Sequence, residues 1–269
     1  MNQLFPPVSA SERPHSEPVR FAGALGFPLA GRLTLPAAGE PRAFALFAHC
    51  FTCGKDLKGS YHLAGALASA GIATLRFDFT GLGSSGGDFA DTTFSSNVAD
   101  LQAAAAFLAT RHRAPALLIG HSLGGAAVLQ AACDLPSCRA VATIAAPFEP
   151  GAIIRELLGL DEALASRDGT EVLVAGRRYT IRRQFLDDLE RHEPQRSIRE
   201  LGRALLVLHS PFDRTVPIGE AARIFEAARH PKSFVSLDRA DHILSDPHDA
   251  RYAGEVIAAW ASRYLGADP

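Results

Sequence analysis

Ser122 is the centre of a residue pattern that could carry nucleophilic catalysis. It stands in Gly120-His-Ser-Leu-Gly124, which follows the apolar run 116–119 and precedes the small-residue segment 125–133. Small residues at the first and fifth positions let a strand turn sharply into a helix around a strained serine, whose hydroxyl then projects into solvent. The pattern predicts a nucleophilic serine at the carboxyl end of a strand.

A serine needs a base, and the base needs a group that orients it. His242 is the best candidate for the base, because it lies in the loop between the last predicted strand and the last predicted helix. Asp213 follows the preceding predicted strand and could orient the imidazole, although it could also only cap the helix that begins near Pro217. Asp241 is a competing acid, but adjacent side chains usually point apart. The chain order Ser122, Asp213, His242 therefore predicts a Ser-His-Asp triad.

Two backbone amides are candidates for the donors of an oxyanion hole. The N–H of Leu123 comes directly after the serine, at the start of the predicted helix. The second donor is expected from the loop that follows the predicted strand 43–48. We expect it to be the N–H of Phe51, because a turn there can aim this amide at the serine. His49, at the start of the same loop, either takes part in the site or only braces the loop.

Apolar runs alternate with helical patterns along most of the chain. Strands at 20–24 and 29–35 form an opening hairpin, and further strands are predicted at 43–48, 72–77, 116–119, 140–145, 204–209 and 233–237. Helices are predicted at 61–70, 97–110, 124–133 and 218–228, the second of them capped by Ser95 or Ser96. This order predicts an α/β fold, in which helices cover both faces of a mainly parallel central sheet and the active edge lies at the carboxyl ends of the strands.

Residues 147–201 interrupt this alternation. They contain helical patterns at 151–166 and 183–191, and a short hairpin of 171–174 and 178–181 that turns through 175–177. An insertion here would lie over the serine as a lid, unless it is only a surface excursion. Its apolar residues Ile153, Ile154, Leu157 and Leu158 are expected to wall an acyl or alcohol pocket.

Two further motifs suggest other chemistry but have weaker support. Cys50 and Cys53 form a C-x-x-C pattern beside His49, yet no second pair of such ligands stands at zinc-site spacing. Residues 81–86 match a dinucleotide-binding fingerprint, but the next predicted helix begins only near Ser95, and such a fingerprint opens its helix within the motif. We expect these glycines to shape a tight turn that Asp78 braces.

Composition predicts a globular protein with one large core. The chain has 269 residues, 47% of them hydrophobic, and a formal net charge of −2, which gives no reason to expect a nucleic-acid partner. Residues 1–18 read as a loose tail rather than a signal peptide, and no apolar run approaches membrane-spanning length. A cytoplasmic location without membrane association and four reduced cysteines are therefore expected. The sequence does not predict an oligomeric state.

The chain resembles the α/β-hydrolase superfamily over residues 19–266. The motifs that carry the resemblance are His49-Cys-Phe-Thr52, Arg76-Phe-Asp-Phe-Thr-Gly-Leu-Gly-Ser-Ser85, Gly120-His-Ser-Leu-Gly-Gly125, the Asp213 loop and Asp241-His242. More narrowly, it is similar to bacterial hydrolases of the serine-aminopeptidase-like and feruloyl-esterase-like group, and to hydrolase domains that are fused to OsmC-like domains. Cys50 stands where many relatives have glycine.

These motifs imply an ester hydrolase that works through an acyl-enzyme. Ser122, His242 and Asp213 would form the triad, and the N–H groups of Phe51 and Leu123 would form the oxyanion hole. Small-molecule carboxylic esters of short to medium acyl chain are the expected substrates, and no metal or organic cofactor is required. A peptidase, a thioesterase and a non-catalytic binding module of the same fold remain as alternatives.

Overall fold

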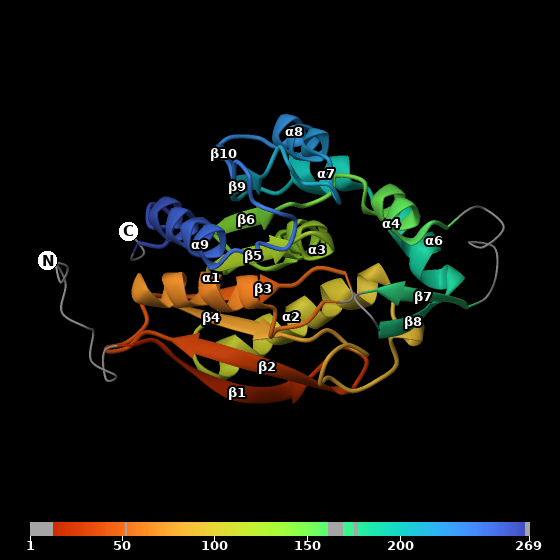
Figure 1. Ribbon diagram of the computed structural model, residues 1–269. Helices are drawn as coiled ribbons and strands as arrows, with labels where there is room; N and C mark the ends of the chain where they lie inside the picture. Colours follow the sequence, from red (N-terminus) through yellow and green to blue (C-terminus); the bar gives the residue numbers. More distant parts are fainter. Residues whose placement is uncertain (1–12, 52, 161–168, 175–176, 267–269) are drawn as a thin grey trace, which may run out of the picture.

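The chain folds around one eight-stranded sheet. The computed structural model describes residues 13–51, 53–160, 169–174 and 177–266. The strand order is β1-β2-β4-β3-β5-β6-β9-β10, with helices on both faces (Figure 1). β2 pairs antiparallel with β1 and β4, whereas the other neighbouring strands pair in parallel. The predicted α/β fold with a mainly parallel sheet is confirmed.

The elements of this core follow the predicted alternation. The strands of the large sheet are β1 (His15–Ala22), β2 (Pro28–Leu35), β3 (Ala43–Ala48), β4 (Ile72–Phe77), β5 (Leu117–His121), β6 (Ala140–Ile144), β9 (Ala204–His209) and β10 (Lys232–Ser236). The helices that cover it are α1 (Lys58–Ser69), α2 (Phe94–Arg111), α3 (Leu123–Ala131), α8 (Ile218–Ala227) and α9 (Pro247–Ala261), with short 3-10 helices η2 (Phe89–Asp91) and η3 (Ala132–Asp134). Among the described residues, none of these helices combines the length and the apolar character needed to cross a bilayer.

The two faces of the sheet are buried in separate apolar clusters. On one face, Leu67 of α1 and Ile257 of α9 pack against the central strands. On the other face, Leu101 of α2, Val128 of α3 and Ile224 of α8 form the second cluster. The central strands β3, β4, β5, β6 and β9 are buried along their whole length, since both faces are covered. In open sheets of this kind, ligands bind in the crevice at the carboxyl ends of the strands.

The N-terminal part of the sheet differs from the prediction in two places. Strand β1 begins at His15, inside the segment 1–18 that was expected to be a loose tail, because His15 to Ala22 pair antiparallel with β2. Residues 1–12 of that segment lie outside the described residues. Helix α2 is capped by Thr93 instead of Ser95 or Ser96: the Thr93 hydroxyl accepts a hydrogen bond from the Ser96 amide, and the Ser96 hydroxyl accepts one from the Thr93 amide.

The insertion after β6 contains α4 (Pro150–Leu158), a separate two-stranded sheet of β7 (Thr170–Val174) and β8 (Arg177–Ile181), α6 (Arg183–Arg191) and α7 (Pro194–Arg199). The predicted hairpin and the helix at 183–191 are confirmed, while α7 was not expected. The helix predicted to run over 151–166 ends at Leu158, because Gly159 takes the left-handed conformation with φ 61°. Residues 161–166 of that prediction and residues 175–176 of the hairpin turn lie outside the described residues. Figure 1 shows α4, β7, β8 and α6 gathered beside one end of the sheet.

Candidate active site

Ser122 lies in a sharp turn between β5 and α3. Its backbone has φ 55° and ψ −125°, a conformation that residues with a side chain rarely adopt. Its amide donates to the carbonyl of Ile144 at 2.9 Å, and its carbonyl accepts from the amide of Gly125 at 2.8 Å. Strand β6 and the first turn of α3 therefore hold the strained serine in place, as the sequence predicts for a nucleophile turn.

The glycines on either side of Ser122 are required by close approach of the backbone. A Cβ atom on Gly120 would lie 2.2 Å from the carbonyl oxygen of Gly124. A Cβ atom on Gly124 would lie 2.4 Å from the carbonyl oxygen of Ala48 and 2.5 Å from that of His49. All three distances are far below van der Waals contact. The small residues thus let the first turn of α3 pack directly against the end of β3.

Asp213 and His242 come together from two different loops at the carboxyl edge of the sheet. Nδ1 of His242 lies 2.8 Å from Oδ2 of Asp213. The other oxygen, Oδ1, accepts from the amides of Thr215 at 2.8 Å and Val216 at 2.9 Å. Burial opposes ionisation of Asp213, but the hydrogen bonds from His242 and from these amides lower its pKa overall. A carboxylate on Nδ1 leaves Nε2 of His242 able to accept a proton, which is the tautomer that a general base requires.

Asp241 has a different partner. Its Oδ1 accepts from the amide of Ser245 at 2.8 Å, and its Oδ2 is hydrogen-bonded to the hydroxyl of the same residue. These bonds stabilise the turn that leads into α9. The contact with the His242 ring is made by Asp213, as expected for the orienting acid.

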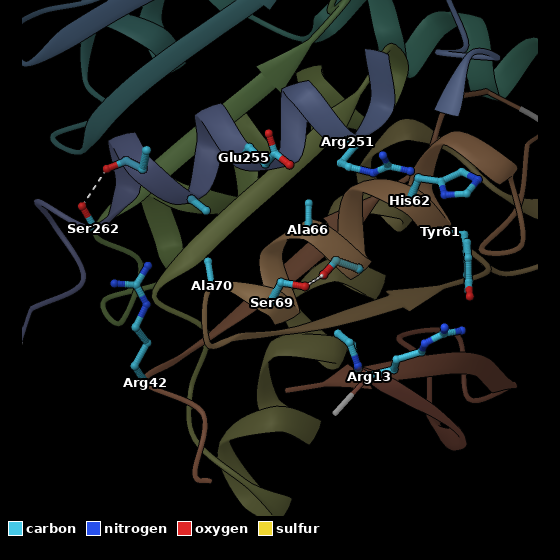
Figure 2. Close-up of a pocket in the computed structure, with 14 residues that line it drawn as sticks. Arg13, Arg42, Tyr61, His62, Ala66, Ser69, Ala70, Arg251, Glu255 and Ser262 are labelled. Atoms are coloured by element: carbon cyan, nitrogen blue, oxygen red, sulfur yellow. Dashed lines mark hydrogen bonds between the residues drawn. The ribbon is translucent and has the colours of Figure 1, made fainter. Parts of the chain in front are cut away.

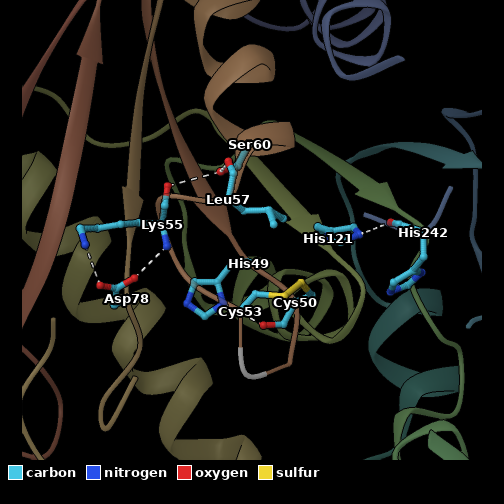
Figure 3. Close-up of a disulfide and its surroundings, with 9 residues drawn as sticks. All are labelled: His49, Cys50, Cys53, Lys55, Leu57, Ser60, Asp78, His121 and His242. Atoms are coloured by element: carbon cyan, nitrogen blue, oxygen red, sulfur yellow. Dashed lines mark hydrogen bonds and ion pairs between the residues drawn. A yellow bond between two sulfur atoms is a disulfide. The ribbon is translucent and has the colours of Figure 1, made fainter. Parts of the chain in front are cut away.

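Two buried histidines beside this pair were not among the predicted site residues. Nε2 of His121 lies 2.6 Å from the carbonyl oxygen of His242 (Figure 3). Nε2 of His209 lies 2.9 Å from the carbonyl oxygen of Val216 and 3.6 Å from Oδ2 of Asp213. Burial lowers the pKa of both rings, that of His121 to about 3, so both are neutral and donate to carbonyls. The sequence feature that could have identified these two histidines is their place at the last position of an otherwise mostly apolar strand, β5 for His121 and β9 for His209.

The loop after β3 borders the first turn of α3. His49 is buried, and its Nδ1 lies 2.8 Å from the carbonyl oxygen of Cys50, so its ring braces this loop. Phe51 and Leu123 both line a small cavity between the loop and α3. The two amides expected to form an oxyanion hole therefore belong to segments that meet at one place.

Cys50 and Cys53 form a disulfide, which corrects the expectation of four reduced cysteines (Figure 3). The amide of Cys53 donates to the carbonyl of Cys50 at 3.1 Å, and their Cα atoms lie 5.3 Å apart, a separation that a disulfide spans. The expectation of reduced cysteines rested on an assumed cytoplasmic location. The tight turn after β3 brings the two sulfur atoms together. Cys133 and Cys138 are free thiols.

Asp78 joins this loop to the glycine-rich segment 81–86. Its Oδ1 accepts from the amide of Lys55 at 2.7 Å, and its Oδ2 accepts from the Lys55 ammonium at 2.8 Å and from the amide of Ser84 at 2.9 Å. Gly83 has φ 56°, and a Cβ atom there would lie 2.2 Å from Oδ2 of Asp78. The glycines therefore wrap around a carboxylate, and α2 begins only at Phe94. This confirms the prediction of a tight turn braced by Asp78.

The insertion after β6 contacts the loop after β3 through aromatic side chains. The ring of Phe185 in α6 has its centroid 5.7 Å from that of Phe51 and 5.6 Å from that of Phe89. Tyr179 of β8 also packs against Phe89 at 5.6 Å. Of the apolar residues expected to wall a pocket, Ile154 is buried, but Leu157 is 48% exposed. Contact with the loop after β3 is thus made by α6.

A large cavity lies apart from these residues. It is a groove of about 1140 Å³ between α1 and α9, bordered by Arg13, Arg42, His62 and Arg251 (Figure 2). None of its lining residues belongs to the candidate triad. Within the described ranges, no group of three or more His, Cys, Asp or Glu side chains is placed to hold a metal ion. The candidate site is therefore identified by its hydrogen-bond geometry and not by the size of a cavity.

Comparison with known proteins identifies the family. The model of the Alpha/beta hydrolase family matches residues 45–260, most of the chain. This chain belongs to the alpha/beta hydrolase family. A curated relative, the uncharacterized protein YfhR of Salmonella typhi, is 26% identical over 260 residues, which cover 94% of this chain and 81% of that protein.

Solved structures with the same fold include several esterases. The esterase domain of a Rhodothermus marinus protein is 48% identical, with a TM-score of 0.78 over 94% of this chain and 100% of that one. Est1E from Butyrivibrio proteoclasticus, solved with ferulic acid bound, is 20% identical, with a TM-score of 0.78 over 92% of this chain and 99% of that one. The second likeness shows the fold alone. Family membership and the first likeness support a hydrolase activity for this chain.

Proposed function

We propose that this protein is a serine hydrolase that cleaves small-molecule carboxylic esters with short to medium acyl chains. The observation that carries the proposal is the 2.8 Å hydrogen bond between Asp213 and His242, at the sheet edge where Ser122 occupies its strained turn. The likeness to the esterase domain of a Rhodothermus marinus protein favours esters over other acyl compounds.

The proposed reaction uses these side chains in two half-reactions. Ser122 Oγ attacks the acyl carbon while Nε2 of His242 takes the hydroxyl proton. The imidazolium then gives this proton to the leaving alcohol, and the acyl group stays on Ser122 as an ester. A water molecule attacks that ester while His242 takes one of its protons, and the imidazolium then returns this proton to Ser122 Oγ as the bond to the acyl carbon breaks and the carboxylic acid leaves. Asp213 keeps the ring oriented and stabilises its positive charge throughout.

The negative charge of each tetrahedral intermediate needs donors that are already in place. We assign this role to the backbone N–H groups of Leu123 and Phe51. Leu123 is the first residue of α3, where helix geometry leaves amides without an intrahelical partner and the helix dipole favours an anion. Phe51 borders the same small cavity as Leu123.

The preference for short and medium acyl chains rests on the aromatic side chains beside the oxyanion loop. Phe51, Phe89 and Phe185 are buried and pack against one another. Rigid rings at this position would form a wall that limits the depth of an acyl pocket. The insertion would then set substrate size through α6.

A panel of substrates tests the proposed reaction class. Initial rates would be measured with p-nitrophenyl esters from acetate to palmitate, an acyl thioester and an aminoacyl p-nitroanilide. The proposal predicts the highest kcat/KM for acetate to hexanoate esters and much lower values for the anilide. Faster cleavage of the anilide or the thioester would replace the esterase assignment by a peptidase or a thioesterase.

A further inference from the structure

Two buried polar atoms close to the proposed oxyanion hole lack a hydrogen-bond partner among the described residues. They are Nε2 of His49 in the loop after β3 and Oδ1 of Asn97 in α2. His49 is 1% exposed and Asn97 is 5% exposed. A buried polar atom without a partner loses its hydration without gaining a hydrogen bond in return, so two of them near one site call for a physical explanation.

Both residues line one small cavity. Its volume is about 10 Å³, and its other walls include Phe79, Leu123 and Ala127. A space of this size holds about one water molecule when polar partners are available. The remaining walls are largely apolar, so a molecule there would find its hydrogen bonds mainly at His49 and Asn97.

The protonation of His49 decides which molecule fits. Its Nδ1 lies 2.8 Å from the carbonyl oxygen of Cys50, and a carbonyl can only accept, so Nδ1 carries the proton. Burial lowers the pKa of His49, which leaves the ring neutral and makes Nε2 an acceptor. Oδ1 of Asn97 is also an acceptor. The cavity therefore presents two acceptors, and a water molecule has the two O–H donors that match them.

We propose that one buried water molecule donates a hydrogen bond to His49 Nε2 and another to Asn97 Oδ1, and that Asn97 and His49 act as positioning residues for the oxyanion loop. The water links α2 to the His49 ring, and the ring holds the Cys50 carbonyl directly before the Phe51 amide. This inference rests on the proposed function, because it assigns the Phe51 N–H to the oxyanion hole.

A positioning role affects the transition state more than the ground state. Loosening the Phe51 amide weakens binding of the developing oxyanion, whereas binding of the neutral substrate carbonyl changes little. Loss of the water contact is therefore expected to lower kcat and to leave KM nearly unchanged. A residue that only stabilises the fold would lower the melting temperature without this selective effect.

The test compares two variants of the full chain. Asn97→Leu removes the acceptor with little change in volume, and Thr74→Val is the control. Thr74 in β4 also has a buried hydroxyl without a partner among the described residues, but it does not line this cavity. The readouts are kcat and KM for p-nitrophenyl butyrate, inhibition by a trifluoromethyl ketone that forms a tetrahedral oxyanion, and the melting temperature.

We expect Asn97→Leu to lower kcat and ketone affinity about tenfold with KM within about twofold, and Thr74→Val to stay near the parent. Equal kinetics of Asn97→Leu and Thr74→Val would overturn the positioning role. A crystal structure of the parent should show an ordered water within about 3.2 Å of both atoms, and a direct His49–Asn97 bond would overturn the water site. Failure of the proposed function is distinguishable, because the parent would then lack both esterase activity and fluorophosphonate labelling.

Discussion

The imidazole of His121 donates from Nε2 to the main-chain carbonyl of His242 at 2.6 Å. His121 is the last residue of β5 and directly precedes Ser122, so one hydrogen bond ties the nucleophile strand to the loop that carries the proposed base. The two rings lie 5.0 Å apart between centroids. The position of His242 is therefore fixed from two sides, through its ring by Asp213 and through its backbone by His121.

The buried state of His121 predicts how stability depends on pH. Burial and the nearby charge of His242 lower the pKa of His121 from 6.5 to about 3. Between these values the unfolded chain binds a proton at this position that the folded chain does not bind. Stability is therefore lost as the pH falls from 6.5 toward 3, by up to about 1.4 kcal/mol per pH unit. Burial also lowers the pKa of His49 and His209, and these rings contribute in the same direction.

Urea unfolding at a series of pH values from 4 to 8 checks this prediction. The glutamine of His121→Gln can still donate to the His242 carbonyl but does not titrate. Below pH 6.5 the free energy of unfolding of this variant should therefore fall less steeply with pH than that of the parent, and the difference should correspond to close to one proton. His62 lies in α1 away from the candidate site, and His62→Gln serves as a control for the histidine-to-glutamine change itself. Identical slopes for His121→Gln and the parent would show that His121 does not remain neutral in the fold.

The two candidate acids should differ strongly in their kinetic effect. Asp213→Asn leaves the His242 ring without the partner that fixes its tautomer, and kcat should fall on the order of 10³- to 10⁴-fold. Asp241→Asn disturbs only a turn with Ser245, and less than a tenfold loss is expected. Matched kinetics on p-nitrophenyl butyrate decide the point, and the opposite ranking would transfer the orienting role to Asp241.

The sequence predicts the sheet and the places of the three candidate triad residues, because the patterns that indicate them are local. Apolar strands followed by small or polar residues place Ser122, Asp213 and His242 after β5, β9 and β10, so a parallel sheet brings them to one edge. Their chain order could be recognised without knowing any distance. The Asp213–His242 contact then follows from the strand order of the sheet.

Other features depend on contacts that no local pattern encodes. The partners of His121 and His209 are backbone carbonyls, and a carbonyl carries no sequence signal. The Cys50–Cys53 disulfide depends on the conformation of a four-residue turn. Strand β1 was predicted too short because its first residues are polar or proline, and only their pairing with β2 makes them part of the sheet.

The disulfide should affect both activity and stability. It closes a loop of only four residues, for which the entropic stabilisation is on the order of 2 kcal/mol. It also flanks Phe51, the proposed oxyanion donor. We therefore expect the Cys50→Ser/Cys53→Ser double variant to lose kcat severalfold and to melt several degrees below the parent, and Cys133→Ser, which removes an exposed free thiol, to match the parent.

Thiol titration in denaturant provides a direct check of this pairing. Protein purified without reductant should show two reactive thiols, from Cys133 and Cys138, and four after reduction. Four thiols before reduction would contradict the disulfide. An unchanged kcat in the double variant would show that the pairing does not position Phe51.

Phe185 should influence the acyl-chain preference. Its ring is 2% exposed and packs on Phe51 and Phe89. Phe185→Leu keeps an apolar side chain but shortens the aromatic wall, so octanoate should gain relative to butyrate by about fivefold in kcat/KM, an effect of the size expected for one or two methylene groups. Leu157→Ala changes an exposed residue of α4 and should leave the profile unchanged. If both variants keep the parental profile, α6 does not bound the acyl pocket.

The central claim is that Ser122 forms an acyl-enzyme, and the most direct measurement is covalent labelling followed by intact mass and peptide mapping. The parent, incubated with a fluorophosphonate, should gain one label on the peptide that contains Ser122 and lose p-nitrophenyl butyrate hydrolysis in proportion. Ser122→Ala should take up no label and lose kcat on the order of 10⁴-fold or more, with an unchanged circular dichroism spectrum. Labelling at another residue, or near-parental hydrolysis by Ser122→Ala, would contradict the account.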